Sequence, residues 1–551
     1  MEQTPERTNL WIGRALLLFA VFALCWQARS LYTFPIPDSV NYWYGDESWL
    51  MFEARAQASD GVLRHPYAYG ATLNDQAGVL IGNSWGASLL YGLPAFVFSH
   101  SFPAIAIGRT VTFGLALLAV FAMFFIALRL GVSPLVAGFA SILLATSPAF
   151  TIASHSARSD LLVGLVVMLV VAFFTRELAK NQRERSAKWW FGFGAIITLL
   201  ALIFAIHLVT LLLPLALFLL IRLGAFRNFK LLLAALAGVV AATIVLVGSY
   251  ALLTHDLSLF GTSGQHVQFV DVAAQKPFVR LFSRSVQLNN MAQRFALLWS
   301  GAPALMILIV LSLIEVVVIM LRKRTDTLKE PRLRALLTLT LIVGASWLLL
   351  QGSISYYMPH FLLLAVLAAA VLADRSLFAS LRPLNARAII ASAALVLLVM
   401  HVREVDKTIA ASRFFSNENQ RAVSKLQNRI HSEIDSTKEH LPVVLAESPA
   451  AYRLELDSSI TLMSPLFPAF PKYDDSIAAT LARYHVRYAL LYDGKELHDN
   501  IAGVPKLTAY IESRGTLVDT AMGIMFDMKR SYIHPDVSSQ DTMKLYRLNA
   551  Y

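Results

Sequence analysis

The sequence predicts a polytopic α-helical membrane protein of about eleven transmembrane helices, followed by a C-terminal extracytoplasmic α/β domain. Two observations lead to this prediction. Of the 551 residues, 56% are hydrophobic and only 15% are charged, whereas about a quarter of the residues of a soluble domain are charged. The apolar residues also gather in runs that are long enough to cross a bilayer. An ordinary soluble protein is therefore excluded.

A spanning helix needs about 20 mostly apolar residues. The first run is interpreted as a transmembrane helix that is not cleaved. A lipoprotein signal peptide cleaved before Cys25 would need a small residue at position 24, where this sequence has the bulky Leu24. Cys25 is the one cysteine, so no intramolecular disulfide is expected. The predicted spans lie near 10–27, 104–128, 134–152, 160–178, 189–206, 208–222, 229–253, 295–321, 334–351, 358–374 and 387–402.

The net charge of +11 is explained by the position of the basic residues. Lysine and arginine cluster in short loops between apolar runs, near 176–188, 222–230, 322–334 and 375–387. A cytoplasmic N-terminus puts all these loops inside, as the positive-inside rule requires, and this holds only if 189–222 forms two helices. The expected partner is therefore the lipid bilayer, and no nucleic acid is implied.

The same topology divides the chain into two predicted domains, 1–402 in the membrane and 403–551 outside it. The segment 28–103 becomes a long first exterior loop with helices that lie in the membrane interface. In the tail, 443–446, 486–492 and 544–548 read as strands, while 477–485 and 504–514 read as helices. This alternation predicts a small α/β domain.

Titratable and cationic groups from separate loops are expected at one outer edge of the membrane. Carboxylates next to lipid are costly, which makes them functional candidates. A carboxylate there can act as general base toward a hydroxyl, and arginine or histidine can hold a phosphate. The structural alternatives stay open: Asp46 and Asp160 as helix caps, Arg158 as an ion-pair partner, the tyrosines as an aromatic belt. The candidates are Asp46, Glu47, His65, His155, Arg158, Asp160, Tyr356, Tyr357 and His360.

The order and sidedness of these motifs resemble the GT-C glycosyltransferases, the class of the protein O-mannosyltransferases and the aminoarabinose transferases of lipid A. The likeness lies in Asp46-Glu47 in a long first exterior loop, and in Arg158 and Asp160 after a short exterior turn. It continues in Gly108-Arg109-Thr110 in the second helix and in 356–359 at the start of a late helix. It covers essentially the whole chain and implies a GT-C-like fold.

The resemblance implies inverting transfer of a sugar from a polyprenyl-phosphate donor to a lipid, glycan or protein acceptor. Asp46 would be the catalytic base, Glu47 would position the acceptor, and Asp160 would be a supporting carboxylate. Arg158, His155 and His360 would neutralise the departing phosphate. Some branches of the family use a divalent cation such as Mg²⁺ or Mn²⁺ and others do not, so metal dependence stays open. The first exterior loop has no lysine, so a phosphate-binding lysine of some relatives has no counterpart.

The short loops and the absence of a retrieval signal at the end of the sequence favour a bacterial plasma (inner) membrane. The alternative is a multi-pass transporter or lipid flippase. Transporters favour internal repeats and broken helices with polar groups at the midplane. Here the sequence shows no repeat, the helices read as continuous and the polar groups gather at one edge. A scaffold for the exterior domain is a third hypothesis.

Overall fold

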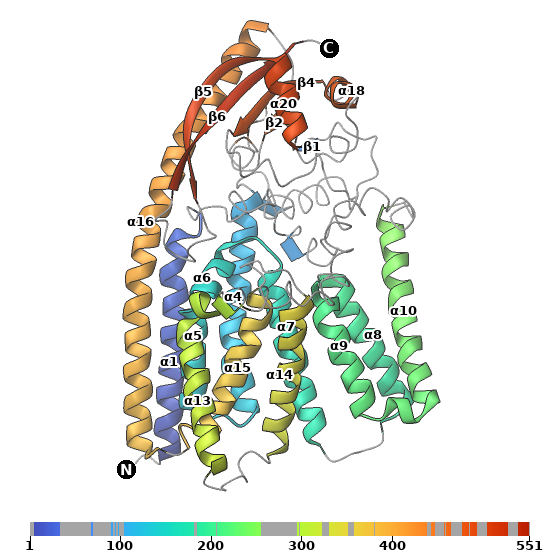
Figure 1. The fold of residues 1–551 in the computed structure, drawn as a ribbon, viewed down its shortest axis with the longest axis vertical. Coiled ribbons are helices and arrows are strands. Elements are labelled where there is room, and N and C mark those ends of the chain that lie inside the picture. Colours follow the sequence, from blue (N-terminus) through green and yellow to red (C-terminus); the bar gives the residue numbers. More distant parts are fainter. Residues whose placement is uncertain are drawn as a thin grey trace.

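A computed structural model shows a helical bundle with a small mixed sheet at one end (Figure 1). The N-terminus lies at the opposite end of the bundle from the sheet. The structure describes residues 5–32, 68–69, 90–91, 94, 97–98, 104–180, 185–204, 207–254, 292, 295–296, 298–321, 330–350, 358–379, 381–437, 442–446, 454, 457, 459–463, 476–483, 485–492, 504–526 and 538–549.

Each of the eleven predicted apolar runs overlaps a helix. The two expected within 189–222 are separate helices, as predicted. The bundle helices are α1 (Pro5–Gln27), α4 (Ala104–Arg129), α5 (Pro134–Ala145), α6 (Pro148–His155), α7 (Asp160–Ala179), α8 (Ala187–Phe204), α9 (His207–Arg222), α10 (Phe229–Thr254), α13 (Pro303–Leu321), α14 (Pro331–Leu350), α15 (Pro359–Arg375) and α16 (Pro383–Thr437), with short 3₁₀ turns η1 (Ala28–Ser30) and η3 (Ala225–Arg227).

The bundle has the outer surface of a membrane protein. In the described part of the chain, seven helices are long and apolar enough to span a bilayer, or eight if one bent pair counts as a span. Two further apolar helices are shorter. Phe229, Leu321 and Leu341 are each more than two-thirds exposed, which is favourable where lipid rather than water surrounds the side chain. The chain is therefore a polytopic membrane protein, although the count of eleven spans is not confirmed.

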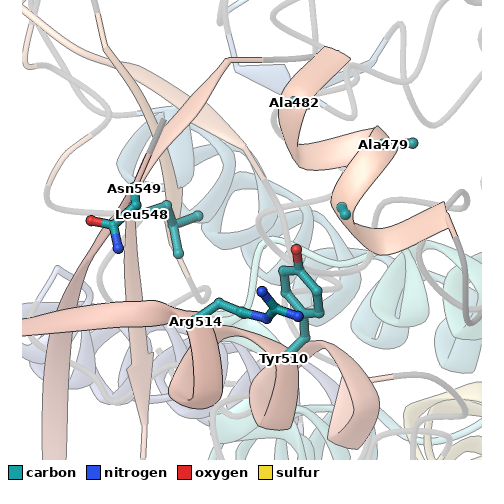
Figure 2. Close-up of a pocket in the computed structure, with 7 residues that line it drawn as sticks. Ala479, Ala482, Tyr510, Arg514, Leu548 and Asn549 are labelled. Atoms are coloured by element: carbon teal, nitrogen blue, oxygen red, sulfur yellow. The ribbon is translucent and has the colours of Figure 1, made fainter. Parts of the chain in front are cut away.

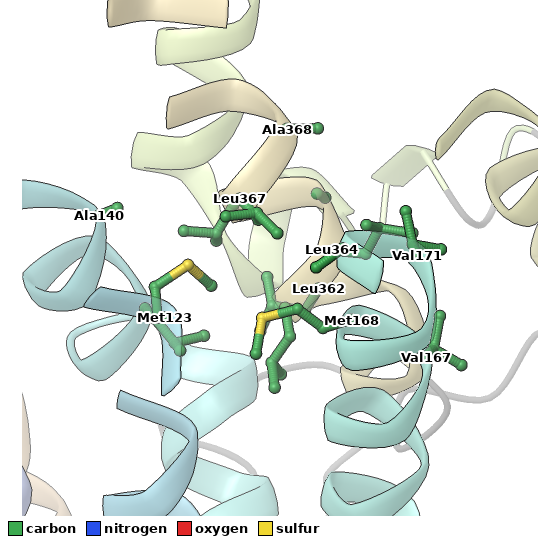
Figure 3. Packing of buried hydrophobic residues seen from close by; sticks show 14 of the residues in the cluster. Met123, Ala140, Val167, Met168, Val171, Leu362, Leu364, Leu367 and Ala368 are labelled. Carbon is green, nitrogen blue, oxygen red and sulfur yellow. The ribbon is translucent and has the colours of Figure 1, made fainter. Parts of the chain in front are cut away.

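The centre of the bundle is α7 packed against α15. Figure 3 shows their side chains interlocking with those of α4 and α5, among them Met123, Ala140, Met168 and Leu362. Met168 and Leu362 are fully buried. Because protein interiors are close-packed, such a core fixes the relative positions of the helix ends to within a small tolerance. Side chains at the ends of α7 and α15 are therefore held in a defined arrangement.

The run 134–152 was expected to be one continuous helix, and this prediction is wrong. It forms α5 and α6, which meet at a bend of 63°. Proline at position 148 removes a backbone donor and pushes the residue before it out of helical conformation. Ser147 accordingly has φ −75° and ψ 134°, and Pro148 begins the next helix. The bend leaves the end of α6 beside the start of α7.

The tail contributes five strands to a six-stranded sheet, which has the order β1-β3-β2-β4-β6-β5 in the described residues. The strands expected at 443–446, 486–492 and 544–548 are confirmed, and so are both helices. The 12-residue strand β5 is a correction, because the sequence did not indicate it. The elements are β1 (Ala68–Tyr69), β2 (Val443–Ala446), β3 (Thr461–Met463), β4 (Val486–Tyr492), β5 (Gly515–Phe526) and β6 (Ser538–Leu548), with α18 (Ser476–Arg483) and α20 (Val504–Arg514).

Helices cover both faces of this sheet. Alternate residues of β4 point to opposite faces, so that Tyr488 and Leu490 pack with Leu426 of α16, while Ala489 and Leu491 pack with the helices α18 and α20. Helix α16 continues without a break from the bundle into this layer (Figure 1). The expected domain boundary at residue 402 falls inside that helix.

A polar cluster fastens the segment before β3 to α16. Gln427 donates a hydrogen bond to Asp457 Oδ2 at 2.6 Å, and His431 Nε2 lies 2.7 Å from the same oxygen. Ser459 donates to Asp457 Oδ1 at 2.6 Å and lies 3.1 Å from His431 Nε2. In a Ser-His-Asp triad the serine and the aspartate contact opposite nitrogens of the histidine ring. Here both contact Nε2 of His431, so the cluster is not such a triad. Burial alone would raise the pKa of Asp457, but these hydrogen bonds bring it below its ordinary value.

One strand of the sheet comes from the first exterior loop. β1 pairs antiparallel with β3, with Ala68 opposite Met463 and Tyr69 opposite Leu462. The predicted loop 28–103 is thus joined to the C-terminal sheet by backbone pairing.

Candidate functional site

Three of the predicted residues meet in one buried cluster at the sheet-facing end of the bundle. Arg158 Nε lies 2.6 Å from Asp160 Oδ2, and His360 Nε2 lies 2.8 Å from Asp160 Oδ1. All three side chains are at least nine-tenths buried. Asp160 and His360 are 200 positions apart in the sequence. The predicted topology, which placed their loops at one edge, therefore anticipated their proximity.

Helix ends place the two groups. Asp160 is the first residue of α7, where a carboxylate interacts favourably with the positive end of the helix dipole. His360 is the second residue of α15, directly after Pro359, which is suited to the first turn of a helix. Helices α7 and α15 pack against each other, and the contact between Asp160 and His360 joins their starts.

Glycine allows these two helices to approach closely. A Cβ atom at Gly164 would lie 2.2 Å from the carbonyl oxygen of Pro359, far inside ordinary contact. Gly164 is one turn beyond Asp160 and therefore lies on the same face of α7. Pro359 immediately precedes His360. Any larger residue at 164 would push the start of α15 away from the carboxylate.

A tyrosine holds the backbone of the arginine. The hydroxyl of Tyr91 donates a hydrogen bond to Arg158 O at 2.8 Å and also contacts Thr112 Oγ1 of α4 at 2.9 Å. Tyr91 is fully buried. The amide of Arg158 donates to Ser156 O at 2.8 Å, which closes the short turn between α6 and α7. The turn is therefore braced from α4, and Tyr91 is a residue that sequence reasoning missed, since it stands in an apolar run without any motif.

The electrostatics of the cluster define what it can do. Both oxygens of Asp160 already have a charged or polar partner, so this carboxylate orients Arg158 and His360. A guanidinium has five N–H donors in a planar fork, which suits the oxygens of a phosphate. A buried cation next to an oriented imidazole can stabilise negative charge that develops on a leaving phosphate.

His155 belongs to a second buried cluster. Its Nδ1 lies 2.7 Å from Thr151 O, and its Nε2 lies 2.9 Å from Gln27 O and 3.0 Å from Ser30 Oγ. Gln27 also donates to Ser154 Oγ at 3.0 Å. Both ring nitrogens of His155 therefore already have partners inside the protein. Gln27 is the second residue of the site region that sequence reasoning missed. The available signal was its position, because it is a single amide side chain at the end of an apolar run.

Arg109 is buried in α4 and donates to Leu31 O at 3.0 Å, so it ties that helix to the segment after α1. The other predicted site residues, Asp46, Glu47, His65, Tyr356 and Tyr357, lie outside the described residues. Among the residues that are described, no group of three or more histidine, cysteine, aspartate or glutamate side chains could hold a metal ion.

Fold and site together describe a multi-pass membrane protein with a polar cluster at the end of its bundle that faces an α/β sheet. No protein-family model matches the chain, and no curated protein does. Among solved structures, it is similar to ArnT from Cupriavidus metallidurans bound to undecaprenyl phosphate, with a TM-score of 0.48 and 12% sequence identity over 96% of this chain and 97% of that one. For ArnT in the apo state the TM-score is 0.49 with 15% identity, over 97% of each chain.

Proposed function

We propose that this chain is a GT-C-type glycosyltransferase that moves a sugar from a polyprenyl-phosphate donor to a lipid, glycan or protein acceptor. The observation that carries the proposal is the buried cluster of Arg158, Asp160 and His360, which joins two motifs of the sequence resemblance at one end of the bundle. An arginine fork oriented by a carboxylate is suited to a phosphate leaving group.

The residues divide the work as follows. Asp46 removes the proton from the acceptor hydroxyl, and Glu47 positions that acceptor. Arg158 and His360 take the charge of the departing polyprenyl phosphate while Asp160 keeps both oriented. His155 positions the turn that carries Arg158, because its ring nitrogens bridge α6 and the end of α1. Tyr356, Tyr357 and His65 line the substrate space. Transfer is inverting, since the acceptor attacks opposite the leaving phosphate.

The reaction takes place on the outer face of a bacterial plasma (inner) membrane. The N-terminus is cytoplasmic and the sheet domain lies outside, because the helix ends that flank the basic stretches, such as the end of α9 and the start of α10, lie at the N-terminal end of the bundle (Figure 1). The donor is then membrane-embedded, with its sugar at the outer surface. A divalent cation such as Mg²⁺ or Mn²⁺ is tested by adding and removing it in the assay below.

One observation favours the alternative of a transporter or lipid flippase. The bend of 63° between α5 and α6 is a broken helix next to the candidate site, and broken helices occur at transporter sites. Pro148 accounts for the bend locally. The two functions differ in chemistry, because a flippase moves a polyprenyl-phosphate sugar without cleaving it.

The test is turnover of radiolabelled polyprenyl-phosphate sugars, beginning with undecaprenyl phosphate donors, by purified protein in native lipid extract. We expect release of free polyprenyl phosphate from the wild type and none from Asp46→Asn. The matched control is Asp75→Asn, which removes a carboxylate from the same predicted loop and should keep activity. A folded Asp46→Asn variant with normal release would contradict the base assignment. Translocation of intact donor without release would favour the flippase.

A further inference from the structure

The C-terminal domain has a groove of about 490 Å³ between α18, α20 and the end of β6. It lies on a different part of the molecule from the Arg158 cluster, on the side of the sheet that carries α18 and α20 (Figure 1). Its volume is in the range of small-molecule sites, roughly 300–1,000 Å³. It is lined by Ala478, Ala479, Ala482, Tyr510, Arg514, Leu548 and Asn549.

The two helices leave this space because of their sequence pattern. Helix α18 packs Ile477 and Leu481 into the domain core, and the alanines between them face the groove with only a methyl group each. Helix α20 buries Leu507 and Ile511 in the same core. Tyr510 and Arg514 are one turn apart on α20, so both lie on one face. In Figure 2 their side chains rise from α20 into the space between α18 and Leu548.

The polar groups of the groove are available for a ligand. Within the described part of the chain, the guanidinium of Arg514, the hydroxyl of Tyr510 and the amide of Asn549 have no hydrogen-bond or ion-pair partner. Two other arginines of this domain share one carboxylate: Arg547 Nη1 lies 2.6 Å from Glu433 Oε2, and Arg429 pairs with the same carboxylate. Arg514 is thus a cation at the edge of a groove, with no counterion among the described residues.

The chemistry of the lining selects the ligand. Among the described residues that line the groove, Arg514 is the one charged group and none is a carboxylate, so this lining favours an anion. The neighbouring Glu512 is turned toward Lys544 and Tyr546 instead. The ring of Tyr510 offers a flat apolar face with a polar tip, and an asparagine amide both donates and accepts hydrogen bonds. This combination fits a sugar ring that carries a phosphate or a carboxylate.

We propose that this groove binds an anionic saccharide and thereby tethers a charged glycan to the extramembrane domain. Arg514 binds the phosphate or carboxylate through two parallel hydrogen bonds, Tyr510 packs on the ring, and Asn549 bonds its hydroxyls. The role as a tether rests on the proposed function, because a transferase with a glycan acceptor gains from holding that acceptor at high effective concentration. The binding itself does not depend on catalysis.

The test is direct titration of the full-length protein in detergent with glucose 6-phosphate and galacturonate, with glucose and inorganic phosphate for comparison. We expect the two charged sugars to bind more tightly than either glucose or phosphate alone. Arg514→Gln should weaken binding of the charged sugars by about tenfold or more. Ala479→Trp should abolish it by filling the groove, since Ala479 is exposed and the fold does not need a small residue there.

The matched control is Arg421→Gln, which removes an exposed arginine of α16 away from the groove and should leave the affinity unchanged. Asp46→Asn should bind the charged sugars like the wild type, so loss of transfer and loss of binding are read separately. Absence of saturable binding by the wild type, or equal affinity in Arg514→Gln, would overturn the proposal. Binding of inorganic phosphate as tight as that of glucose 6-phosphate would reduce the groove to a simple anion site and overturn the assignment to a saccharide.

Discussion

Replacing Gly164 by alanine should force apart α7 and α15, whose close contact at Gly164 and Pro359 holds the candidate site together. The added Cβ would lie 2.2 Å from Pro359 O and 3.1 Å from its carbonyl carbon, whereas ordinary contact begins at 3.4 Å. Relief of the first contact requires α7 and α15 to separate by about 1.2 Å. Backbone atoms form the obstacle, so no side chain can turn away to relieve it.

The separation acts directly on the hydrogen bond between Asp160 and His360. A distance of 2.8 Å would grow to about 4.0 Å, which is beyond hydrogen-bonding range. Overpacking of a close-packed core costs about 1–3 kcal/mol. A misplacement of about 1 Å in a catalytic arrangement costs roughly a hundredfold in rate. We therefore expect a lower melting temperature and about a hundredfold loss of transfer.

The assay is release of polyprenyl phosphate together with thermal unfolding of the purified variants in detergent. Gly192→Ala on α8 is the matched control, because nothing lies within 4 Å of a Cβ atom there, and it should behave like the wild type. Wild-type activity and stability in Gly164→Ala would refute the argument that this close approach assembles the site.

Three further changes test other parts of the structure. Asp160→Asn leaves the buried Arg158 without its carboxylate, so we expect a stability loss of about 3–5 kcal/mol and a loss of transfer smaller than that of Asp46→Asn; failure to insert into the membrane at all would reduce Asp160 to a structural cap. Leu426→Ala removes a fully buried side chain between α16 and the sheet and should cost about 2–5 kcal/mol, seen as protease sensitivity of the C-terminal domain; unchanged resistance would argue against a shared core. The lowered pKa of Asp457 means that the folded state favours its charged form, so its contribution to stability is present above about pH 4 and is lost as the pH falls through the lowered value. Asp457→Asn should therefore flatten the acid side of the stability profile measured by thermal unfolding, and an unaltered profile would remove Asp457 from this role.

The helical part of the fold was predictable because lipid imposes one rule on every spanning segment: length and apolar composition. The predicted sidedness came from the basic loops through the positive-inside rule, and it placed Asp160 and His360 at one edge. Length and apolar composition did not give the bend at Pro148, because Thr146 and Ser147 before the proline are uncharged and interrupt the apolar run only briefly. Strand β5 was missed because its alternation is weak: Leu517 and Met522 are both exposed on a strand that lies at the edge of the sheet.

The packing around the site was not predictable from the sequence. Each ring nitrogen of His155 lies within 3 Å of a backbone carbonyl, of α6 for Nδ1 and of α1 for Nε2, and every residue has a carbonyl, so no side-chain pattern marks these partners. The contact of Tyr91 with Arg158 was unpredictable for the same reason, because the Tyr91 hydroxyl donates to the backbone carbonyl of Arg158. Gly164 is one of 27 glycines in the chain, and only the position of Pro359 on a helix 195 residues later makes it necessary.

The pairing of β1 with β3 has a consequence for the order in which the protein is made. Ala68 is synthesised almost 400 residues before its partner Met463. At about 5–20 residues per second, this interval lasts roughly 20 to 80 seconds. A strand of two residues is not stable by itself, so the pairing of the first exterior loop with the sheet waits until β3 has been synthesised. A nascent chain stopped before residue 461 would have inserted every predicted span, yet the segment that follows the proposed base would still lack its anchor. Synthesis of β3 is thus the step that allows this pairing, and a chain released before it lacks the backbone pairing between that loop and the sheet.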